Sequence, residues 1–274
     1  MQPKPFVSIG LPVYNAENII ARCIESLLNQ TFKDFELIIS DNCSSDATEA
    51  ICKDYANIDS RIKYIRQPIN VGMIPNFNLV LEQAQSKYFM WAAADDIRDH
   101  IFLEKAVQIL KTNDDCVVVL SHFQIFDYKN NNIVNKITPS SYCHDLSFMR
   151  LNRVIEDLHP NLMYGLFKVS SNKSDFFLES IDWTDILWVA RVVTRGKYYI
   201  IPEVLYTIGI NGSKRRPYSL EGKYLTLSKF RKEYKKILKR CNPPFIFYLK
   251  QIIKLYTITN KSMKIVNKEI LSTS

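Results

Sequence analysis

The segment ELIISD, residues 36–41, closes an apolar run with a carboxylate, and YFMWAAADD, residues 88–96, closes another with two. Each run has the length and composition of a buried strand, so Asp41 and the pair Asp95–Asp96 are expected where strands end. In an open α/β sheet, ligands bind in the crevice beyond the carboxyl ends of the strands. Acidic side chains at that edge suit a nucleotide together with a divalent cation.

Strand-like and helical patterns alternate through the first half of the chain. The strand-like runs begin near Val7, Glu36, Ile62 and Tyr88, and apolar residues recur three and four apart between them. Residues 46–49, DATE, place an acid three positions before a glutamate, which is a helix start signal. This alternation predicts βαβ units with right-handed connections, and therefore a Rossmann-like, mostly parallel twisted sheet with flanking helices.

The second half is patterned less regularly. We expect a helix over about 101–112, a strand over 116–126, a turn at 129–132, and loop with short helix over 139–163. A further helix should run from about Asp185 to Arg195 and stop at Gly196. Residues 197–206 should form an edge strand, because Pro202 cannot donate to a ladder.

Composition excludes several classes of protein. Among 274 residues, 47% are hydrophobic, which is enough for a sizeable core. Only 7 residues are glycine, and the absence of G-x-G-x-x-G and of a P-loop disfavours a nicotinamide dehydrogenase. The six cysteines lack C-x-x-C spacing and the four histidines lack metal-ligand spacing, which favours free thiols in a reducing cytosol. The sequence shows neither a signal peptide nor a run of 18 apolar residues, so we expect a cytoplasmic protein without a membrane span.

The charge is distributed unevenly. Residues 214–274 carry 16 Lys/Arg against 3 Glu, whereas residues 1–213 carry 20 basic and 25 acidic residues. We therefore divide the chain into a body, 1–213, and a basic amphipathic helical tail, 214–274. Apolar residues three and four apart run from Leu220 to Cys241, Pro243-Pro244 breaks the helix, and a largely apolar segment follows over 245–258.

The tail pattern allows three interpretations. It can dock on the body, lie on an anionic membrane surface, or bind nucleic acid. The tail contains no recognised nucleic-acid motif, so we expect no nucleic-acid partner. We favour docking together with membrane association, which makes the protein peripheral on the inner face of the membrane.

Three strand ends together offer a pocket for a ribonucleotide. PVYNAE (12–17), DNCSSDAT (41–48) and ADD (94–96) follow the first, second and fourth strands. A base can lie against Tyr14 or Pro12, and Asp41 can accept a hydrogen bond from a base N–H. Asp95 can accept from ribose hydroxyls and Asp96 can hold a metal. Mg²⁺ and Mn²⁺ are hard cations that take oxygen ligands, substrate phosphates among them.

These residues resemble those of the family 2 glycosyltransferases, inverting enzymes of the GT-A fold that use nucleotide-diphosphate sugars. The resemblance extends over about residues 6–206. It rests on VSIGLPVYNAE (7–17), ISDNCSSDAT (39–48), Asn70-x-Gly72 with Asn76, MWAAADD (90–96), YGLFK (164–168) and the segment 184–206. It implies a GT-A catalytic domain over 1–213, extended by the helical tail.

The resemblance also implies roles for individual residues. The nucleotide-sugar pocket would be formed by Pro12, Tyr14, Asn15, Glu17, Asp41, Asn70, Gly72, Asn76 and Asp95. Asp95 and Asp96 would form the metal site for Mn²⁺ or Mg²⁺, with Asp96 as the ligand, and Asp185 would be the catalytic base. Inversion by direct displacement needs one carboxylate near the acceptor hydroxyl, and a helix N-terminus should keep Asp185 ionised.

The implied activity is transfer of a sugar from a nucleotide-diphosphate donor, with UDP favoured, to a hydroxyl of a glycan or glycolipid in cell-surface polysaccharide synthesis. Two departures from the family pattern support an alternative, a catalytically impaired scaffold that still binds a nucleotide sugar. Ala94 replaces the first acid of a D-x-D motif, and Thr184 replaces the usual glutamate before the base.

Rival assignments stay open for several residues. Asp182 competes with Asp185 as base, and either Asp41 or Asp185 could be a helix cap without chemistry. Trp183 and Trp188 suit the core or a wall of the acceptor cleft. A further group of cations could contact the diphosphate, namely Lys214, Arg215 and Arg216. The sequence leaves the donor sugar, the acceptor and the oligomeric state open.

Overall fold

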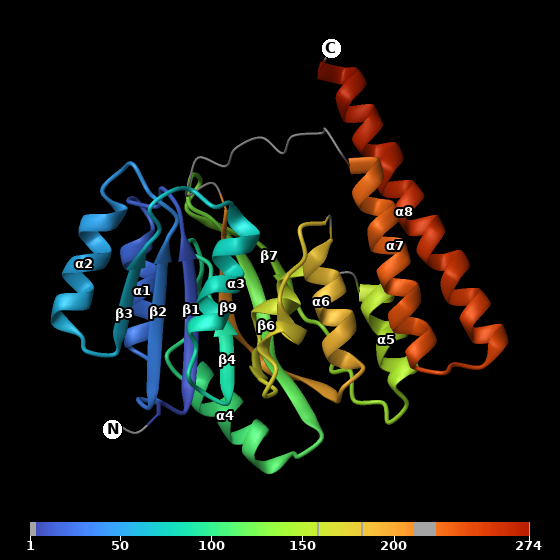
Figure 1. Cartoon of the computed structure of the whole chain (residues 1–274), viewed down its shortest axis with the longest axis horizontal. Helices are drawn as coiled ribbons and strands as arrows, with labels where there is room; N and C mark the ends of the chain where they lie inside the picture. The colour runs from blue at the N-terminus through green and yellow to red at the C-terminus, as the bar shows by residue number, and fades with distance from the viewer. Residues whose placement is uncertain (1–3, 158, 182, 211–222, 274) are drawn as a thin grey trace.

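One curled sheet of nine strands forms the centre of the protein (Figure 1). The computed structural model describes residues 4–157, 159–181, 183–210 and 223–273. The strands follow the order β3-β2-β1-β4-β8-β6-β9-β5, and β7 pairs with β6. Their bounds are β1 Val7–Val13, β2 Phe35–Asp41, β3 Ile62–Arg66, β4 Tyr88–Trp91, β5 Ile97–Arg98, β6 Cys116–Asp127, β7 Asn132–Ile137, β8 Leu166–Lys168 and β9 Lys197–Ile210.

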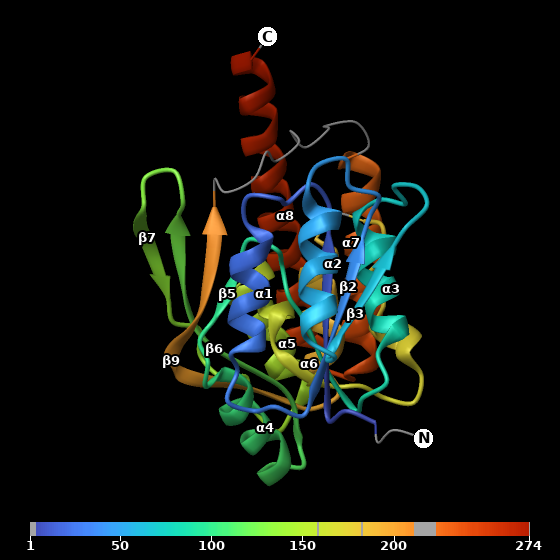
Figure 2. The ribbon, with the colours of Figure 1, turned by 90° about the vertical axis from the view of Figure 1, so that its left-hand side faces the viewer.

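Eight α-helices lie around this sheet in the described part of the chain. They are α1 Ile20–Leu28, α2 Thr48–Ile58, α3 Met73–Gln83, α4 Phe102–Thr112, α5 Ser147–Asp157, α6 Thr184–Val193, α7 Lys223–Arg240 and α8 Phe245–Thr273. Figure 2 shows α1 and α2 on one side of β2 and β3, and α3 on the other. Two short 3₁₀ helices complete the elements, η1 Pro160–Tyr164 and η2 Lys173–Phe176.

The first four strands are parallel, as predicted. β1 pairs with β2 so that Val13 lies opposite Asp41, and with β4 so that Gly10 lies opposite Trp91. Gly10 permits a close approach, because a Cβ there would lie 2.5 Å from Phe89 Cζ and 2.6 Å from Val80 Cγ2. This register brings the carboxyl ends of β1, β2 and β4 to one edge of the sheet.

The other half of the sheet is mixed. β8 is antiparallel to both β4 and β6, whereas β6 and β9 form a long parallel ladder. The β6–β9 register shifts between Ser121, opposite Ile201, and His122, opposite Val204, so Pro202 falls in a bulge where its missing N–H breaks no ladder bond. β9, expected to be an edge strand, is the last but one in the order, because β5 pairs with Tyr206 and Thr207 and Tyr142 bridges to Tyr198.

Several elements differ from the sequence-based expectation. The turn at 129–132 leads into β7, an exposed strand whose asparagines gave no strand signal, and β9 continues to Ile210. β5 and β8 have two and three residues, too few for a periodic pattern. The region 139–163, expected to be loop and short helix, contains the 11-residue helix α5, which buries Leu151, Val154 and Ile155.

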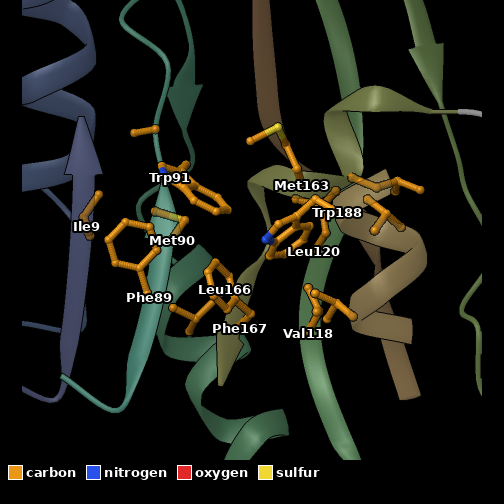
Figure 3. Packing of buried hydrophobic residues seen from close by; sticks show 14 of the residues in the cluster. Ile9, Phe89, Met90, Trp91, Val118, Leu120, Met163, Leu166, Phe167 and Trp188 are labelled. Carbon is orange, nitrogen blue, oxygen red and sulfur yellow. The ribbon is translucent and has the colours of Figure 1, made fainter. Parts of the chain in front are cut away.

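An aromatic cluster packs α6 against the sheet (Figure 3). The Trp188 ring lies 5.3 Å from that of Trp91 and 4.8 Å from that of Phe167, both at steep angles. Trp91 Nε1 also donates to the carbonyl of Phe77, 3.1 Å away. Trp188 is therefore a core residue, and the cluster fixes α6 relative to β4 and β8.

The tail docks on the body through α7. Phe230, Tyr234 and Leu238 are fully buried, and the Tyr234 hydroxyl donates to the Leu151 carbonyl at 3.2 Å. The helix ends before Pro243-Pro244, as predicted, and α8 folds back along α7 and buries Leu255. No helix among the described residues is both long enough and apolar enough to cross a membrane.

Candidate active site

Hydrogen bonds join the loop after β1 to the loop after β2. The backbone N–H of Asn15 donates to Ser44 Oγ at 2.9 Å, and Ser45 N–H donates to Asn15 Oδ1 at 2.8 Å. Glu17 N–H donates to Asp46 Oδ2 at 3.1 Å, while Ala47 N–H returns a 2.9 Å bond to Glu17 Oε2. Asn15 and Glu17 therefore hold the pocket wall together, and a direct contact of either with a nucleotide stays a prediction.

Asp41 is fully buried at the end of β2. Its Oδ1 accepts from Ser44 N–H at 2.9 Å, and its Oδ2 accepts from the Tyr64 hydroxyl at 2.9 Å. Burial, followed by this bond to Asp41, raises the pKa of Tyr64, so that hydroxyl stays a donor. Tyr64 was not predicted as a site residue, because nothing in the strand pattern IKYIR marks it as a partner of Asp41.

A cavity of about 300 Å³ opens beside these loops. Five of the predicted pocket residues line it: Pro12, Tyr14, Asn70, Gly72 and Asn76. Val13, Asn42, Met73 and Phe77 complete the lining. Asp41 lies behind this wall and does not belong to the lining.

Amide side chains hold the far wall of the cavity in place. Asn42 Nδ2 donates to Asn70 Oδ1 at 3.0 Å and to the Gly72 carbonyl at 3.1 Å. Asn76 Nδ2 donates to the Ser40 carbonyl at 2.9 Å, which ties α3 to β2. Gly72 precedes α3 with φ +89°, a conformation that favours glycine. Asn42 escaped the sequence prediction, although it directly follows Asp41.

Asp96 is buried and fixed by β9. The Tyr206 hydroxyl donates to Oδ2, and Gly209 N–H donates to Oδ1 at 3.2 Å. Burial and then the charge of Asp95 raise the pKa of Asp96 to about 7. Gly209 has no room for a side chain, since a Cβ would lie 2.1 Å from the Asp95 carbonyl oxygen. The end of β9 is thus fitted closely around the acidic pair.

Arg98 packs against Tyr206, the residue that holds Asp96. The sequence did not predict Arg98 as a site residue. Its buried guanidinium lies 3.6 Å from the Tyr206 ring centroid, and Nη2 donates to the Tyr164 carbonyl at 2.5 Å. Burial lowers the pKa of Arg98, and the charge of Asp96 opposes that shift. An arginine two residues after an acidic pair suggests a surface turn, so only the tertiary structure shows its role.

Asp185 is the second residue of α6, and its Oδ1 accepts from Ile186 N–H at 2.7 Å. Burial raises the pKa of Asp185 and outweighs the backbone hydrogen bonds at the helix start, which lower it. Asp182, the rival base, and the cations Lys214, Arg215 and Arg216 lie outside the described residues.

Tyr164 lies beside the tyrosine that holds Asp96. Its ring centroid is 6.2 Å from that of Tyr206, whose hydroxyl donates to Asp96. Burial raises the pKa of the Tyr164 hydroxyl most, and the charges of Asp96, Asp95 and Asp185 raise it further. The predicted metal site and the predicted base, 89 residues apart in sequence, therefore both influence this one side chain.

The acidic pair fits a divalent cation that shares its ligands with a substrate. No group of three or more His, Cys, Asp or Glu side chains among the described residues could hold a metal unaided. Mg²⁺ is commonly bound by one or two carboxylates, with phosphates and water supplying the other ligands. Burial and then the charge of Asp95 raise the pKa of Asp96, and a cation beside the pair would offset that charge.

An α/β sheet with acids, amides and an aromatic at its carboxyl edge is the arrangement expected of a GT-A fold. A family model described as glycosyl transferase family 2 matches residues 8–171. This chain belongs to that family.

Relatives in other organisms carry matching descriptions. An uncharacterised glycosyltransferase of Haemophilus influenzae is 34% identical over 134 residues, covering 49% of this chain and 42% of the relative. The uncharacterised glycosyltransferase MJ1057 of Methanocaldococcus jannaschii is 31% identical over 209 residues, covering 74% and 70%. TuaG of Bacillus subtilis, described provisionally as a teichuronic acid biosynthesis glycosyltransferase, is 36% identical over 107 residues, covering 39% and 42%. The chain thus spans less than half of two of these relatives.

Solved structures share the fold. TarS 1–349 of S. aureus, in complex with UDP-GlcNAc, superposes with a TM-score of 0.67 at 19% identity, covering 85% of this chain and 70% of that one. The mannosyltransferase PcManGT of Pyrobaculum calidifontis, with GDP-Man and Mn²⁺, gives 0.55 at 14% identity, covering 93% and 70%. These likenesses confirm the predicted GT-A fold.

Proposed function

We propose that this chain is an inverting glycosyltransferase that moves a sugar from a UDP-linked donor to a hydroxyl of a glycan or glycolipid. One observation carries the proposal: Tyr206 and Gly209 hold the Asp96 carboxylate at the carboxyl edge of the sheet, the same edge at which the cavity beside Pro12 opens. A metal site and a base on either side of a bound sugar are what displacement at an anomeric carbon requires.

The nucleotide would occupy the cavity lined by Pro12 and Tyr14. Tyr14 is 37% exposed and offers a ring face to a base, and the amides of Asn42 and Asn70 offer polar contacts. Asp41 would accept from the base N–H, which requires that the base reach the carboxylate now bonded to Tyr64. The UDP-GlcNAc complex of TarS supports uridine as the nucleoside.

Asp96 and Asp95 would hold Mn²⁺ or Mg²⁺, in line with the Mn²⁺ of PcManGT. When bound, the ion would neutralise charge that develops on the diphosphate leaving group. The chain itself orients the ligands, because Tyr206 and Gly209 fix the Asp96 carboxylate and Arg98 supports the Tyr206 ring. Such supporting contacts commonly decide how well a ligand serves its metal.

Asp185 would take the proton of the acceptor hydroxyl. Its carboxylate is held by the Ile186 N–H, and the raised pKa makes it a stronger base once it is ionised. The acceptor oxygen then bonds to the anomeric carbon while the bond to the diphosphate oxygen breaks, and the configuration inverts.

We place the reaction in the synthesis of a cell-surface polysaccharide, with the protein in the cytoplasm at the inner face of the membrane. The description of TuaG supports the first part. The basic tail, 214–274, supports the second, because cations near an anionic leaflet favour peripheral association.

A scaffold that binds nucleotide sugars without transferring them is the second candidate. Asp96 favours it, since both its carboxylate oxygens already accept hydrogen bonds from Tyr206 and Gly209. Ala94 and Thr184, which depart from the family pattern, agree with it.

Calorimetry with UDP and Mn²⁺, followed by donor turnover, separates the two. We expect metal-dependent binding by the wild type and weaker binding by Asp41→Ala. Asp185→Asn should bind UDP normally and transfer the sugar about 10²–10⁴-fold more slowly. Wild type that neither binds nor consumes any UDP-sugar contradicts the transferase. Turnover that is lost in Asp96→Ala excludes the scaffold.

A further inference from the structure

The groove between α7 and α8 is strongly cationic. Its volume is about 560 Å³, and α7 lines it with five cations, Arg231, Lys232, Lys235, Lys236 and Lys239, beside Ser228, Tyr248 and Tyr256. The sequence of α7 carries eight Lys/Arg and a single Glu. That residue, Glu233, pairs with Lys236 at 2.7 Å. A groove of this charge fits the phosphate groups of a partner.

Tyr256 forms the wall of the groove on α8. Lys235 Nζ donates to its hydroxyl at 2.8 Å, and the Arg231 guanidinium lies 4.6 Å from the ring centroid. The lysine hydrogen bond lowers the pKa of Tyr256, which is consistent with a positive potential at this surface. Two cations are thereby held in fixed positions at the groove wall.

An apolar ridge adjoins this wall. Phe245, Ile246, Leu249 and Ile253 expose 72%, 69%, 43% and 67% of their surface. Their spacing along α8 places them on one side of the helix, and Tyr256 follows on the same side. The opposite side of α8 is buried through Gln251, Leu255 and Thr259. Figure 1 shows α8 as the outermost element at this end of the protein.

We propose that the groove and the ridge form one docking face for an anionic lipid bilayer. The ridge would enter the boundary between headgroups and acyl chains, as apolar faces of interfacial helices do, and the groove would take lipid phosphates. Apolar residues exposed on successive turns of α8 would gain nothing from contact with a nucleic-acid backbone. They would be buried on contact with a membrane. The inference deepens the peripheral association proposed above and is independent of the donor chemistry.

α7 carries the cations of the docking face and also contacts the turn before the predicted base. It faces the groove with Lys232 and Lys235, and it buries Phe230 against Trp183, two residues before Asp185. The same helix therefore connects the docking face to the start of α6.

Co-sedimentation of the full chain with vesicles tests the proposal. Vesicles of phosphatidylcholine mixed with phosphatidylglycerol should bind the protein, and vesicles of phosphatidylcholine alone should bind it far less. Lys232→Gln, Lys235→Gln and Lys239→Gln together should weaken binding on the order of a hundredfold, from about 1 kcal/mol per lysine near an anionic surface. Ile246→Ser with Ile253→Ser should weaken binding to the mixed vesicles as well.

A matched control removes three exposed lysines of the first half, Lys33, Lys53 and Lys63, each as Gln, and should bind the vesicles like the wild type. Equal binding by the groove variant and this control overturns the proposal. So does duplex DNA binding that the groove variant loses while vesicles never bind. UDP binding by calorimetry, measured on every variant, distinguishes failure of this proposal from failure of the transferase, because the docking face contacts no donor residue.

Discussion

The indole ring of Trp183 packs edge-on against the phenyl ring of Phe230, with centroids 5.2 Å apart and an interplanar angle of 66°. Trp183 immediately precedes α6 and has φ +61°, a left-handed conformation that strains a bulky residue. Asp185 follows two residues later. The contact with α7 therefore braces the turn that orients the predicted base, so the tail helix contributes to the site and is more than an appendage.

Phe230→Ala should lower kcat about tenfold and leave the Kd for UDP unchanged, because the turn before Asp185 loses its brace. It should also destabilise the fold by about 3–5 kcal/mol, the usual range for a buried Phe→Ala. Phe230→Leu should recover part of kcat. Ile237→Ala, on the same buried face of α7, is the control: it should lower stability but not kcat of the folded enzyme. Equal losses of kcat would refute a positioning role.

The pH profile of kcat should show the ionisation of Asp185. Burial raises the pKa of this carboxyl above 3.8, and the base acts only when ionised, so kcat should rise with pH through the raised pKa and then level off. Asp185→Asn should lose about 10²–10⁴-fold in kcat, the range typical of a general base. An acidic limb centred at or below 3.8 would contradict the assignment.

Tyr206→Phe should weaken Mn²⁺ binding in the presence of UDP by about 10–100-fold, the range typical for loss of a group that orients a metal ligand. The physical reason is that Asp96 Oδ2 loses the hydroxyl that holds it. Tyr198→Phe is the matched control, since this buried tyrosine of the same strand donates to the Leu162 carbonyl instead. Calorimetric titration of Mn²⁺ measures both, and unchanged affinity in Tyr206→Phe would oppose the proposed metal site.

Gly209→Ala should weaken metal-dependent UDP binding, because its Cβ would meet the Asp95 carbonyl at 2.1 Å and push the acidic pair away from β9. Overpacking of this kind costs about 1–3 kcal/mol. Gly196→Ala produces a comparable clash, 2.5 Å from the Asp115 carbonyl, outside the site. We expect both variants to melt earlier and only Gly209→Ala to lose metal-dependent binding; identical UDP titrations would count against this reasoning.

The sequence is sufficient to predict the elements that bury apolar residues in a regular pattern. β1, β2 and β4 are such strands, and Asp41 lies at the end of β2 as predicted. The strand expected to run up to Asp95–Asp96 ends at Trp91 instead, and the acidic pair lies in the turn before β5. β7 was missed because it is exposed and lacks apolar alternation, and β5 because two residues carry no period. The spacing of apolar residues within a segment predicts which of its residues are buried. It does not predict which distant segment that strand pairs with.

The candidate site shows the same limit. The positions of Asp95, Asp96 and Asp185 follow from motifs, but the partners of Asp96 come from Tyr206 and Gly209 on β9, more than a hundred residues away. The sequence shows only the helix start as an influence on the pKa of Asp185. Burial by surrounding elements decides the direction of that pKa shift, and no local pattern reports it.

Two bonds join the loop at Glu17 to the loop at Asp46 and Ala47 before any ligand arrives: Glu17 N–H donates to Asp46, and Ala47 N–H donates to the Glu17 carboxylate. The entropy of ordering this pocket wall is lost during folding rather than during binding. These two loops would therefore already have their binding conformation when a nucleotide arrives. The affinity for the nucleotide would not be reduced by the cost of ordering them. The preference for one nucleotide over another would then depend on how well each fits this fixed wall. The association of the nucleoside with the wall should be fast, because no loop has to close.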